Sequence, residues 1–188
     1  MAAHEDRGQM PNNILVNGRP GSGKTTLVVE LVERLAGCGF KAGGFVTEEI
    51  REGPNRAGFE VRDLGGSRAI LAHVQRKGKP RVSKYGIDIV AFESIALPAL
   101  EIGKKEADLL VVDEIGRMEL FSSTFRSTLL ELLVLPVPLV ATVHAGNDAF
   151  TEDILSRKDV SVYGLNPGQR EELLEVVYGS MHKILMVG

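Results

Sequence analysis

Apolar runs of strand length recur along the chain, separated by polar or glycine-rich segments. Uninterrupted runs lie at residues 14–16 and 109–112, and mostly apolar segments of similar length at 42–46, 139–143 and 160–163 are further expected strands. A strand that helices cover on both faces has no side that must be polar. Continuous apolar runs of this length therefore indicate buried strands of a parallel sheet.

Other segments place apolar residues three and four positions apart, which is the spacing of one helix face. We expect helices at residues 25–35, 90–107, 125–135 and 167–177. Pro98 lies inside the second of these and is expected to kink or divide it. The alternation of strands and helices predicts an α/β fold with three layers and a mainly parallel sheet.

One part of the chain shows a different pattern. Residues 59–63 alternate polar and apolar side chains, Gly65 and Gly66 follow, and residues 68–72 can form a return strand. This order predicts a small β-hairpin insertion. Residues 76–84 carry five basic side chains, which suit a solvated loop, a lid or a nucleic-acid contact.

Composition narrows the class of protein. The 188 residues include 22 basic and 25 acidic side chains, a net charge of −3, and no tryptophan, which argues against a dedicated nucleic-acid binder. Cys38 is the single cysteine, so we expect no internal disulfide and a cytoplasmic location. No apolar run is long enough to cross a membrane. We expect a disordered tail at residues 1–12 and one monomeric domain at residues 13–188.

The glycine-rich segment after the first apolar run fits the pattern G-x-x-x-x-G-K-[ST]. Its residues are Gly18, Arg19, Pro20, Gly21, Ser22, Gly23, Lys24 and Thr25, and Thr26 follows them in the predicted helix. Glycines let the backbone approach a phosphate, and the start of the helix supplies N–H groups that bind an anion. Lys24 is expected to reach the β- and γ-phosphates and Thr25 to bind Mg²⁺. A plain glycine-rich turn is the alternative, and G-x-G-x-x-G, the dinucleotide pattern, is absent from this turn.

The apolar run at residues 109–112 ends in two acids, Asp113 and Glu114. In a nucleotide triphosphatase, an acid at this strand end holds Mg²⁺, so we expect Asp113 to be the metal partner. Glu114 is expected to polarise the attacking water, unless both acids simply end the strand in solvent. Asp113 and Gly116 also form the D-x-x-G pattern of GTPases, but no Asn-Lys-x-Asp element for reading guanine occurs.

Three further segments, GFVTEEIR at residues 44–51, YGID at 85–88 and VDEIGRMELF at 112–121, resemble one known family. They are similar to the small P-loop nucleoside-triphosphatases, which comprise the thermophile-type nucleoside-triphosphate phosphatases and their cancer-related relatives. The similarity runs from about residue 14 to residue 177. It implies a RecA-like α/β core and Mg²⁺-dependent hydrolysis of nucleoside triphosphates to diphosphates, with broad base tolerance.

The resemblance also implies two nucleotide-binding segments, of which the phosphate loop is the first. The second comprises Leu110, Val111, Val112, Asp113, Glu114, Ile115, Gly116 and Arg117. The chain departs from the family at Arg117, where lysine is usual, and at Gln169, which puts a base contact there in doubt. Residues 143–146 also depart from the family pattern, so no role is assigned to His144.

Several charged residues near these motifs have more than one candidate role. Glu48 and Glu49 follow the second predicted strand and could orient water, bind Mg²⁺ or lie in a solvated loop. Arg51, Arg56 and Arg117 are candidates for stabilising charge on the γ-phosphate, with surface ion pairs as the alternative. Arg117 ranks first because it lies three residues after Glu114.

The leading hypothesis assigns catalysis to Lys24, Glu114 and Arg117, with a nucleoside triphosphate as substrate and Mg²⁺ as cofactor. A nucleotide or nucleic-acid kinase could use the same phosphate loop but would require a phosphate acceptor. A slow GTP- or ATP-dependent switch or assembly factor is the third interpretation, and the D-x-x-G pattern favours it.

Overall fold

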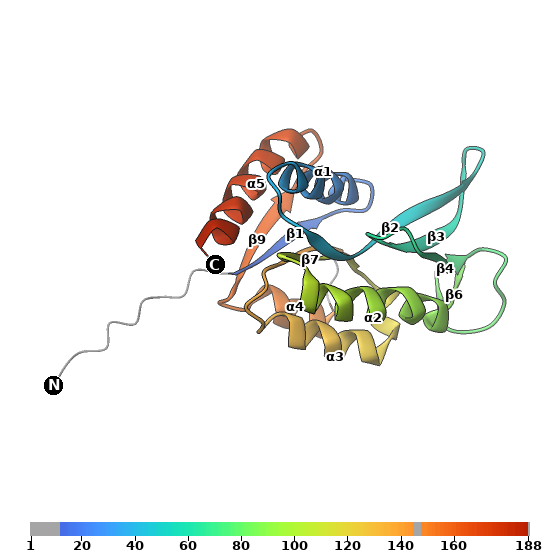
Figure 1. The fold of residues 1–188 in the computed structure, drawn as a ribbon. Coiled ribbons are helices and arrows are strands. Elements are labelled where there is room, and N and C mark those ends of the chain that lie inside the picture. Colours follow the sequence, from blue (N-terminus) through green and yellow to red (C-terminus); the bar gives the residue numbers. More distant parts are fainter. Residues whose placement is uncertain (1–11, 145–147, 188) are drawn as a thin grey trace.

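The computed structural model describes residues 12–144 and 148–187, so the tail predicted at residues 1–12 lies outside the described part except for Asn12. Asn12 belongs to the fold, because its side-chain amide donates to the carbonyl of Pro136 at 2.8 Å. One nine-stranded sheet organises the chain (Figure 1). Its strands are β1 (Asn13–Gly18), β2 (Ala42–Glu52), β3 (Asn55–Asp63), β4 (Arg68–His73), β5 (Arg81–Val82), β6 (Tyr85–Ile87), β7 (Leu109–Ile115), β8 (Leu139–His144) and β9 (Val160–Leu165).

Within the described residues, five α-helices and one short 3-10 helix complete the fold. They are α1 (Lys24–Gly37), α2 (Ile89–Glu106), η1 (Glu119–Phe121), α3 (Ser123–Leu132), α4 (Ala149–Leu155) and α5 (Arg170–Val187). None of the helices in the described part of the chain is long and apolar enough to cross a membrane.

The sheet has the strand order β5-β6-β4-β3-β2-β7-β8-β1-β9 and consists of two halves that share β2. From β2 to β9 the neighbouring strands are parallel, as the apolar runs predicted. From β2 to β5 they are antiparallel. The sheet is therefore mixed, and the predicted hairpin is the centre of a larger antiparallel extension.

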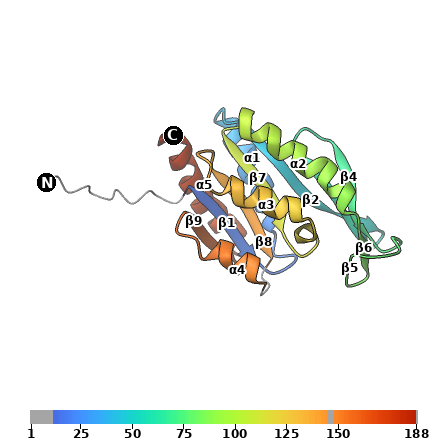
Figure 2. The same ribbon diagram turned by 90° about the horizontal axis from the view of Figure 1, so that it is seen from below.

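Helices cover both faces of the parallel half, which gives the three layers that the sequence predicted. The α1 and α5 helices lie on one face, and α2, α3 and α4 lie on the other (Figures 1 and 2). Alternate residues of β1 supply both cores: Ile14 and Val16 pack toward α1 and α5, and Leu15 belongs to the opposite cluster. Both faces of the strand are therefore buried, which accounts for its uninterrupted apolar run.

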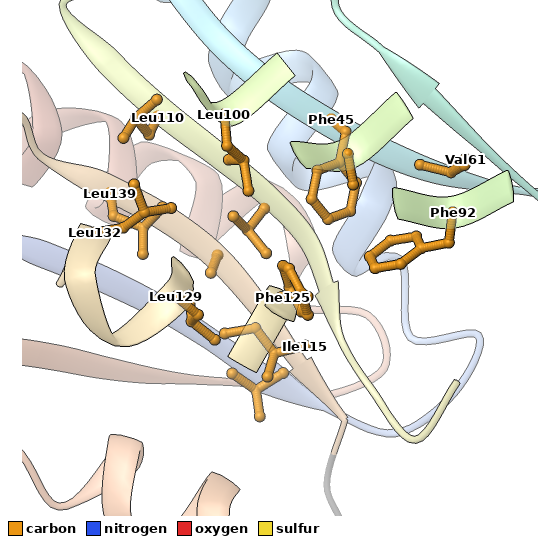
Figure 3. Packing of buried hydrophobic residues seen from close by; sticks show 14 of the residues in the cluster. Phe45, Val61, Phe92, Leu100, Leu110, Ile115, Phe125, Leu129, Leu132 and Leu139 are labelled. Atoms are coloured by element: carbon orange, nitrogen blue, oxygen red, sulfur yellow. The ribbon is translucent and has the colours of Figure 1, made fainter. Parts of the chain in front are cut away.

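Three phenylalanines fix α2 and α3 against the sheet, as Figure 3 shows. The rings of Phe45, Phe92 and Phe125 are fully buried, and their centroids lie 5.2–5.8 Å apart in edge-to-face arrangements. Such aromatic pairs contribute roughly 0.5–1.5 kcal/mol each beyond the area they bury. Because Phe45 lies on β2, Phe92 on α2 and Phe125 on α3, the three rings join this strand to two helices on the same face of the sheet.

Pro98 does not divide α2, so that alternative of the prediction is wrong. The helix runs for 18 residues through Pro98. A proline inside a helix costs about 3 kcal/mol. Burial of Phe92 and Leu100, on either side of it, offsets that cost, because each fully buried side chain contributes roughly 1.5–3 kcal/mol.

Other boundaries also differ from the predictions. The last helix begins at Arg170 rather than at residue 167, and it continues to Val187 rather than ending at residue 177. Neither η1 nor α4 was predicted, because they are only three and seven residues long. Asp148 caps α4 by accepting a hydrogen bond from the backbone N–H of Thr151 at 3.1 Å.

Candidate active site

The phosphate loop lies between β1 and α1, as its sequence predicted. Gly21 and Gly23 have φ values of +74° and +94°, a left-handed conformation that favours glycine. A Cβ added to Gly18 would lie 2.8 Å from the Ser22 hydroxyl and 3.0 Å from the Leu165 carbonyl oxygen. Among the described residues, no side chain caps the start of α1. The first amide groups of the helix are therefore available to an anion.

Lys24 is the first residue of α1 and points back into this loop. Its side chain is 5% exposed. Its ammonium nitrogen Nζ donates to the carbonyl oxygens of Gly18 at 3.0 Å and Arg19 at 3.3 Å. It also lies 3.4 Å from Oε2 of Glu114. The lysine thus connects the phosphate loop to the acidic end of β7.

Asp113 is fully buried at the carboxyl end of β7. Burial raises the pKa of its carboxyl group to about 6, although hydrogen bonds from the Thr142 and Thr25 hydroxyls oppose this rise. The Thr142 hydroxyl donates to Oδ1, and the backbone N–H of Thr47 donates to Oδ2 at 3.4 Å. The two residues predicted to bind the metal, Thr25 and Asp113, are therefore brought together.

Glu114 lies between two basic side chains. One carboxylate oxygen, Oε2, faces Lys24, and the other, Oε1, lies 3.9 Å from Nδ1 of His144. Its side chain is 27% exposed, so it can reach both solvent and the phosphate loop. The peptide bond between Asp113 and Glu114 is cis.

A second glutamate, Glu119, lies behind this edge in η1. A Cβ added to Gly116 would lie 2.8 Å from Oε1 of Glu114 and 2.8 Å from Oε2 of Glu119, so the two carboxyl groups flank this glycine. Burial raises the pKa of Glu119 to about 8, and the nearby charge of Glu114 adds to the rise. Glu119 is therefore a neutral acid at neutral pH.

The remaining predicted residues lie around this centre. Pro20, Thr26 and Arg117 are exposed, the first two on the phosphate loop and α1 and the third directly after the acidic edge. The side chains of the second predicted nucleotide-binding segment that precede Asp113 are part of the hydrophobic core; these are Leu110, Val111 and Val112. Ile115 is buried in the core as well.

Glu48 and Glu49 do not lie in a loop, because β2 extends through them to Glu52. Glu48 accepts two hydrogen bonds from Arg62, at 2.9 and 2.7 Å. Glu49 is ion-paired with both Arg51 and Arg56. The two candidate arginines are therefore both engaged with Glu49, Arg51 on the same strand and Arg56 across the β2–β3 ribbon, while Glu48 is engaged with Arg62.

The basic segment at residues 76–84 contains β5 and is braced by two of its own arginines. Arg76 forms an ion pair with Asp88 at 2.6 Å. Arg81 donates to the carbonyl oxygens of Arg76 at 2.8 Å and Lys84 at 2.5 Å. These contacts show that the segment is a structured surface loop.

Sequence reasoning missed three residues at this edge. Thr142 binds Asp113, and its signal was a single polar residue within the apolar run at 139–143. Glu119 had no signal of its own, because its burial depends on how η1 packs. Arg170, at the start of α5, lies over the phosphate loop: its Cδ would be 3.3 Å from a Cβ on Gly23, and its guanidinium lies 3.5 Å from Glu30.

This arrangement is characteristic of one class of protein. A strand, a phosphate loop and a helix face an acidic strand end at the carboxyl edge of a parallel sheet, with the loop lysine beside the acids. Anions bind at such an edge because backbone N–H groups and the helix dipole point toward it. The fold and the site define a P-loop protein of the α/β class.

Comparison with known proteins identifies the family. The family model described as NTPase matches residues 13–178. The chain is 42% identical to the nucleoside-triphosphatase THEP1 of Methanothermobacter thermautotrophicus over 161 residues, which cover 85% of this chain and 90% of that protein. It is 36% identical to the cancer-related nucleoside-triphosphatase homolog of Bos taurus, with coverage of 92% and 97%. The chain belongs to the NTPase family.

A solved structure confirms the fold. The crystal structure of THEP1 from Aquifex aeolicus superimposes with a TM-score of 0.82 at 35% sequence identity. The match covers 90% of this chain and 98% of that one. The α/β architecture with its mixed, open sheet is therefore shared.

Proposed function

We propose that this protein hydrolyses nucleoside triphosphates to the diphosphate and inorganic phosphate, with broad tolerance for the base. The observation that carries the proposal is the contact of Lys24 with Glu114 at 3.4 Å. It places a lysine suited to the β- and γ-phosphates next to a carboxylate suited to activating water. The curated relatives are named nucleoside-triphosphatases, which supports the same reaction.

The residues of the loop and of β7 fit a divalent cation. Thr25 and Asp113 offer hard oxygen donors side by side, and Asp113 is a buried carboxylate that a cation would compensate. The described residues contain no group of three or more acidic, histidine or cysteine side chains that could hold a metal. This suits Mg²⁺, which usually binds one or two carboxylates together with phosphate oxygens and water. When bound, Mg²⁺ would neutralise charge that develops on the β- and γ-phosphate oxygens.

Glu114 is the proposed general base. As water attacks the γ-phosphorus, a proton passes from the water to the carboxylate, and the bond from the γ-phosphorus to the bridging oxygen breaks. The electron pair of that bond stays on the diphosphate, whose charge Lys24 stabilises. Arg117, exposed beside the acids, is proposed to stabilise the same developing charge.

Broad base tolerance rests on two features. The sequence has no Asn-Lys-x-Asp element, so the usual reader of guanine is missing. The contacts that the site offers at Gly18, Lys24 and Asp113 suit phosphates and metal, which every nucleoside triphosphate shares. Comparable rates on ATP, GTP, CTP and UTP would support this part of the proposal, and activity restricted to one base would contradict it.

The reaction itself is tested by phosphate release from purified protein, with and without Mg²⁺ and with no acceptor added. Glu114→Gln should lower turnover by about 10²–10⁴-fold while nucleotide still binds. Lys24→Ala should weaken binding by the loss of a charge-assisted contact worth about 1.5–3 kcal/mol. Glu33→Gln, an exposed change on α1, is the matched control and should leave both unchanged.

Two outcomes would contradict the assignment. Wild-type turnover in Glu114→Gln would show that Glu114 is not the base. Phosphate release that depends strictly on an added nucleotide or nucleic-acid acceptor would instead identify a kinase.

A further inference from the structure

His144 lies at the acidic edge, and nothing in the sequence gave it a role. It is the last residue of β8 and pairs in register with Gly18, where the phosphate loop begins. Its Nδ1 faces Oε1 of Glu114 at 3.9 Å, while Oε2 of the same carboxylate faces Lys24 at 3.4 Å. The two oxygens of Glu114 thus face two different basic groups, which come from β8 and α1.

Lys24 cannot hold Glu114 throughout the proposed reaction. In this structure the ammonium group faces three protein oxygens, those of Gly18, Arg19 and Glu114. An ammonium has three protons to donate, and two of them go to the carbonyl oxygens of Gly18 and Arg19. When the β- and γ-phosphates of a nucleotide both engage Lys24, at least one of its present contacts must be exchanged, and the ion pair with Glu114 is the longest of them.

Apart from Lys24 and His144, the neighbours of Glu114 at this edge are the acids Asp113 and Glu119. Asp113 accepts hydrogen bonds from Thr142 and Thr47, and within the described residues no hydrogen bond joins Glu114 to either acid. Within the described part of the chain, the ion pairs of Glu114 are those to Lys24 and to His144. His144 is therefore the basic side chain, besides Lys24, that can donate a hydrogen bond to the carboxylate.

We propose that His144 is a positioning residue that holds Glu114 once the nucleotide has engaged Lys24. The inference rests on the proposed role of Glu114 as the base. A movement of about 1 Å would bring Nδ1 and Oε1 from 3.9 Å to hydrogen-bond distance. With Oε1 bound to His144, the other oxygen is left to accept the proton of the attacking water.

Three variants of His144 distinguish the effect of a hydrogen-bond donor at the position of Nδ1 from the effect of side-chain size. His144→Ala should lower kcat by about 10- to 100-fold, the worth of one hydrogen bond to a charged group, with KM nearly unchanged. His144→Asn should restore most of kcat, because its amide nitrogen takes the place of Nδ1. His144→Gln carries its amide nitrogen near the position of Nε2 and should not restore it. His182→Ala, on α5, is the control and should keep wild-type kcat.

The same change is then made in Glu114→Gln. If His144 acts through Glu114, His144→Ala should cause no further loss in that background, because groups that act as a unit are not additive. Thermal melting of each variant shows whether it is folded. If His144→Ala does not fold, the comparison of His144→Asn with His144→Gln still tests the role of the Nδ1 donor.

The outcomes separate this inference from the proposed function. Wild-type kcat in Glu114→Gln would remove the base assignment itself. A slow Glu114→Gln together with wild-type kcat in His144→Ala would leave the base in place and overturn the role of His144. Equal activity of His144→Asn and His144→Gln, or an undiminished loss in the Glu114→Gln background, would overturn it as well.

Discussion

Glu119 should make the protein less stable as the pH rises, which is the reverse of the usual effect of a glutamate. Burial raises the pKa of its carboxyl from the ordinary 4.5 to about 8. The folded state therefore keeps a proton that the unfolded chain loses, and stability falls as the pH rises from 4.5 to about 8. At about 1.36 kcal/mol per pH unit, the full difference corresponds to about 5 kcal/mol.

The change that tests this is Glu119→Gln, because glutamine imitates the neutral acid at every pH. We expect the variant to be within about 1 kcal/mol of wild type at pH 5 and several kcal/mol more stable at pH 8.5. Urea unfolding at both pH values, without nucleotide, measures the free energy of unfolding. The pH-dependent contributions of other groups, including Asp113, are present in both proteins and cancel to first order when the variant is compared with wild type at the same pH.

Glu33→Gln, on the exposed face of α1, is the matched control and should show no such dependence on pH. The reasoning is refuted if Glu119→Gln destabilises the protein equally at both pH values. That result would mean that the carboxyl group of Glu119 is ionised in the folded protein and that its negative charge contributes to stability.

Three further changes test the packing around the site, each by urea unfolding. Gly44→Ala should destabilise by more than about 3 kcal/mol, since Gly44 has a φ of +113° and the new Cβ would lie 2.0 Å from the Val111 carbonyl oxygen. Asn13→Ala should cost about 1–3 kcal/mol, because it leaves the buried N–H of Leu139 without its acceptor. Ser122→Ala should cost about 1 kcal/mol through loss of the α3 cap. A change below about 0.5 kcal/mol in any of them would contradict its mechanism.

Local patterns were enough to predict the parallel half of the molecule. Runs such as residues 14–16 and 109–112 are apolar throughout because helices cover both faces of their strands. The phosphate loop was predictable because its backbone conformation requires particular residue types at fixed positions. Gly21 and Gly23, for example, have positive φ values that favour glycine. Thr25 and Asp113 then meet because the carboxyl ends of parallel strands lie at one edge of the sheet. The loop that leads to Thr25 leaves β1 at this edge, and Asp113 lies near the end of β7.

The antiparallel extension could not be predicted at its full size. Residues 47–52 are mostly charged, so they showed no strand pattern. They form a strand because their acids meet arginines across the ribbon: Glu48 pairs with Arg62, and Glu49 with Arg56. Such partners lie on the neighbouring strand of the ribbon, and a pattern read along one strand does not contain them. The burial of Glu119 was hidden for the same reason.

The placement of β1 has a consequence for how the protein is made. This strand lies between β8 and β9, so the strand that carries the phosphate loop pairs on both sides with the end of the chain. Asn13 and Leu139, for example, bond across 126 positions. Contacts between such distant segments close late in folding, because the intervening chain must first lose its freedom. A growing chain on the ribosome therefore contains the sequence of the phosphate loop well before both neighbouring strands are made, and β1 can be paired on both sides only after residue 165 has emerged.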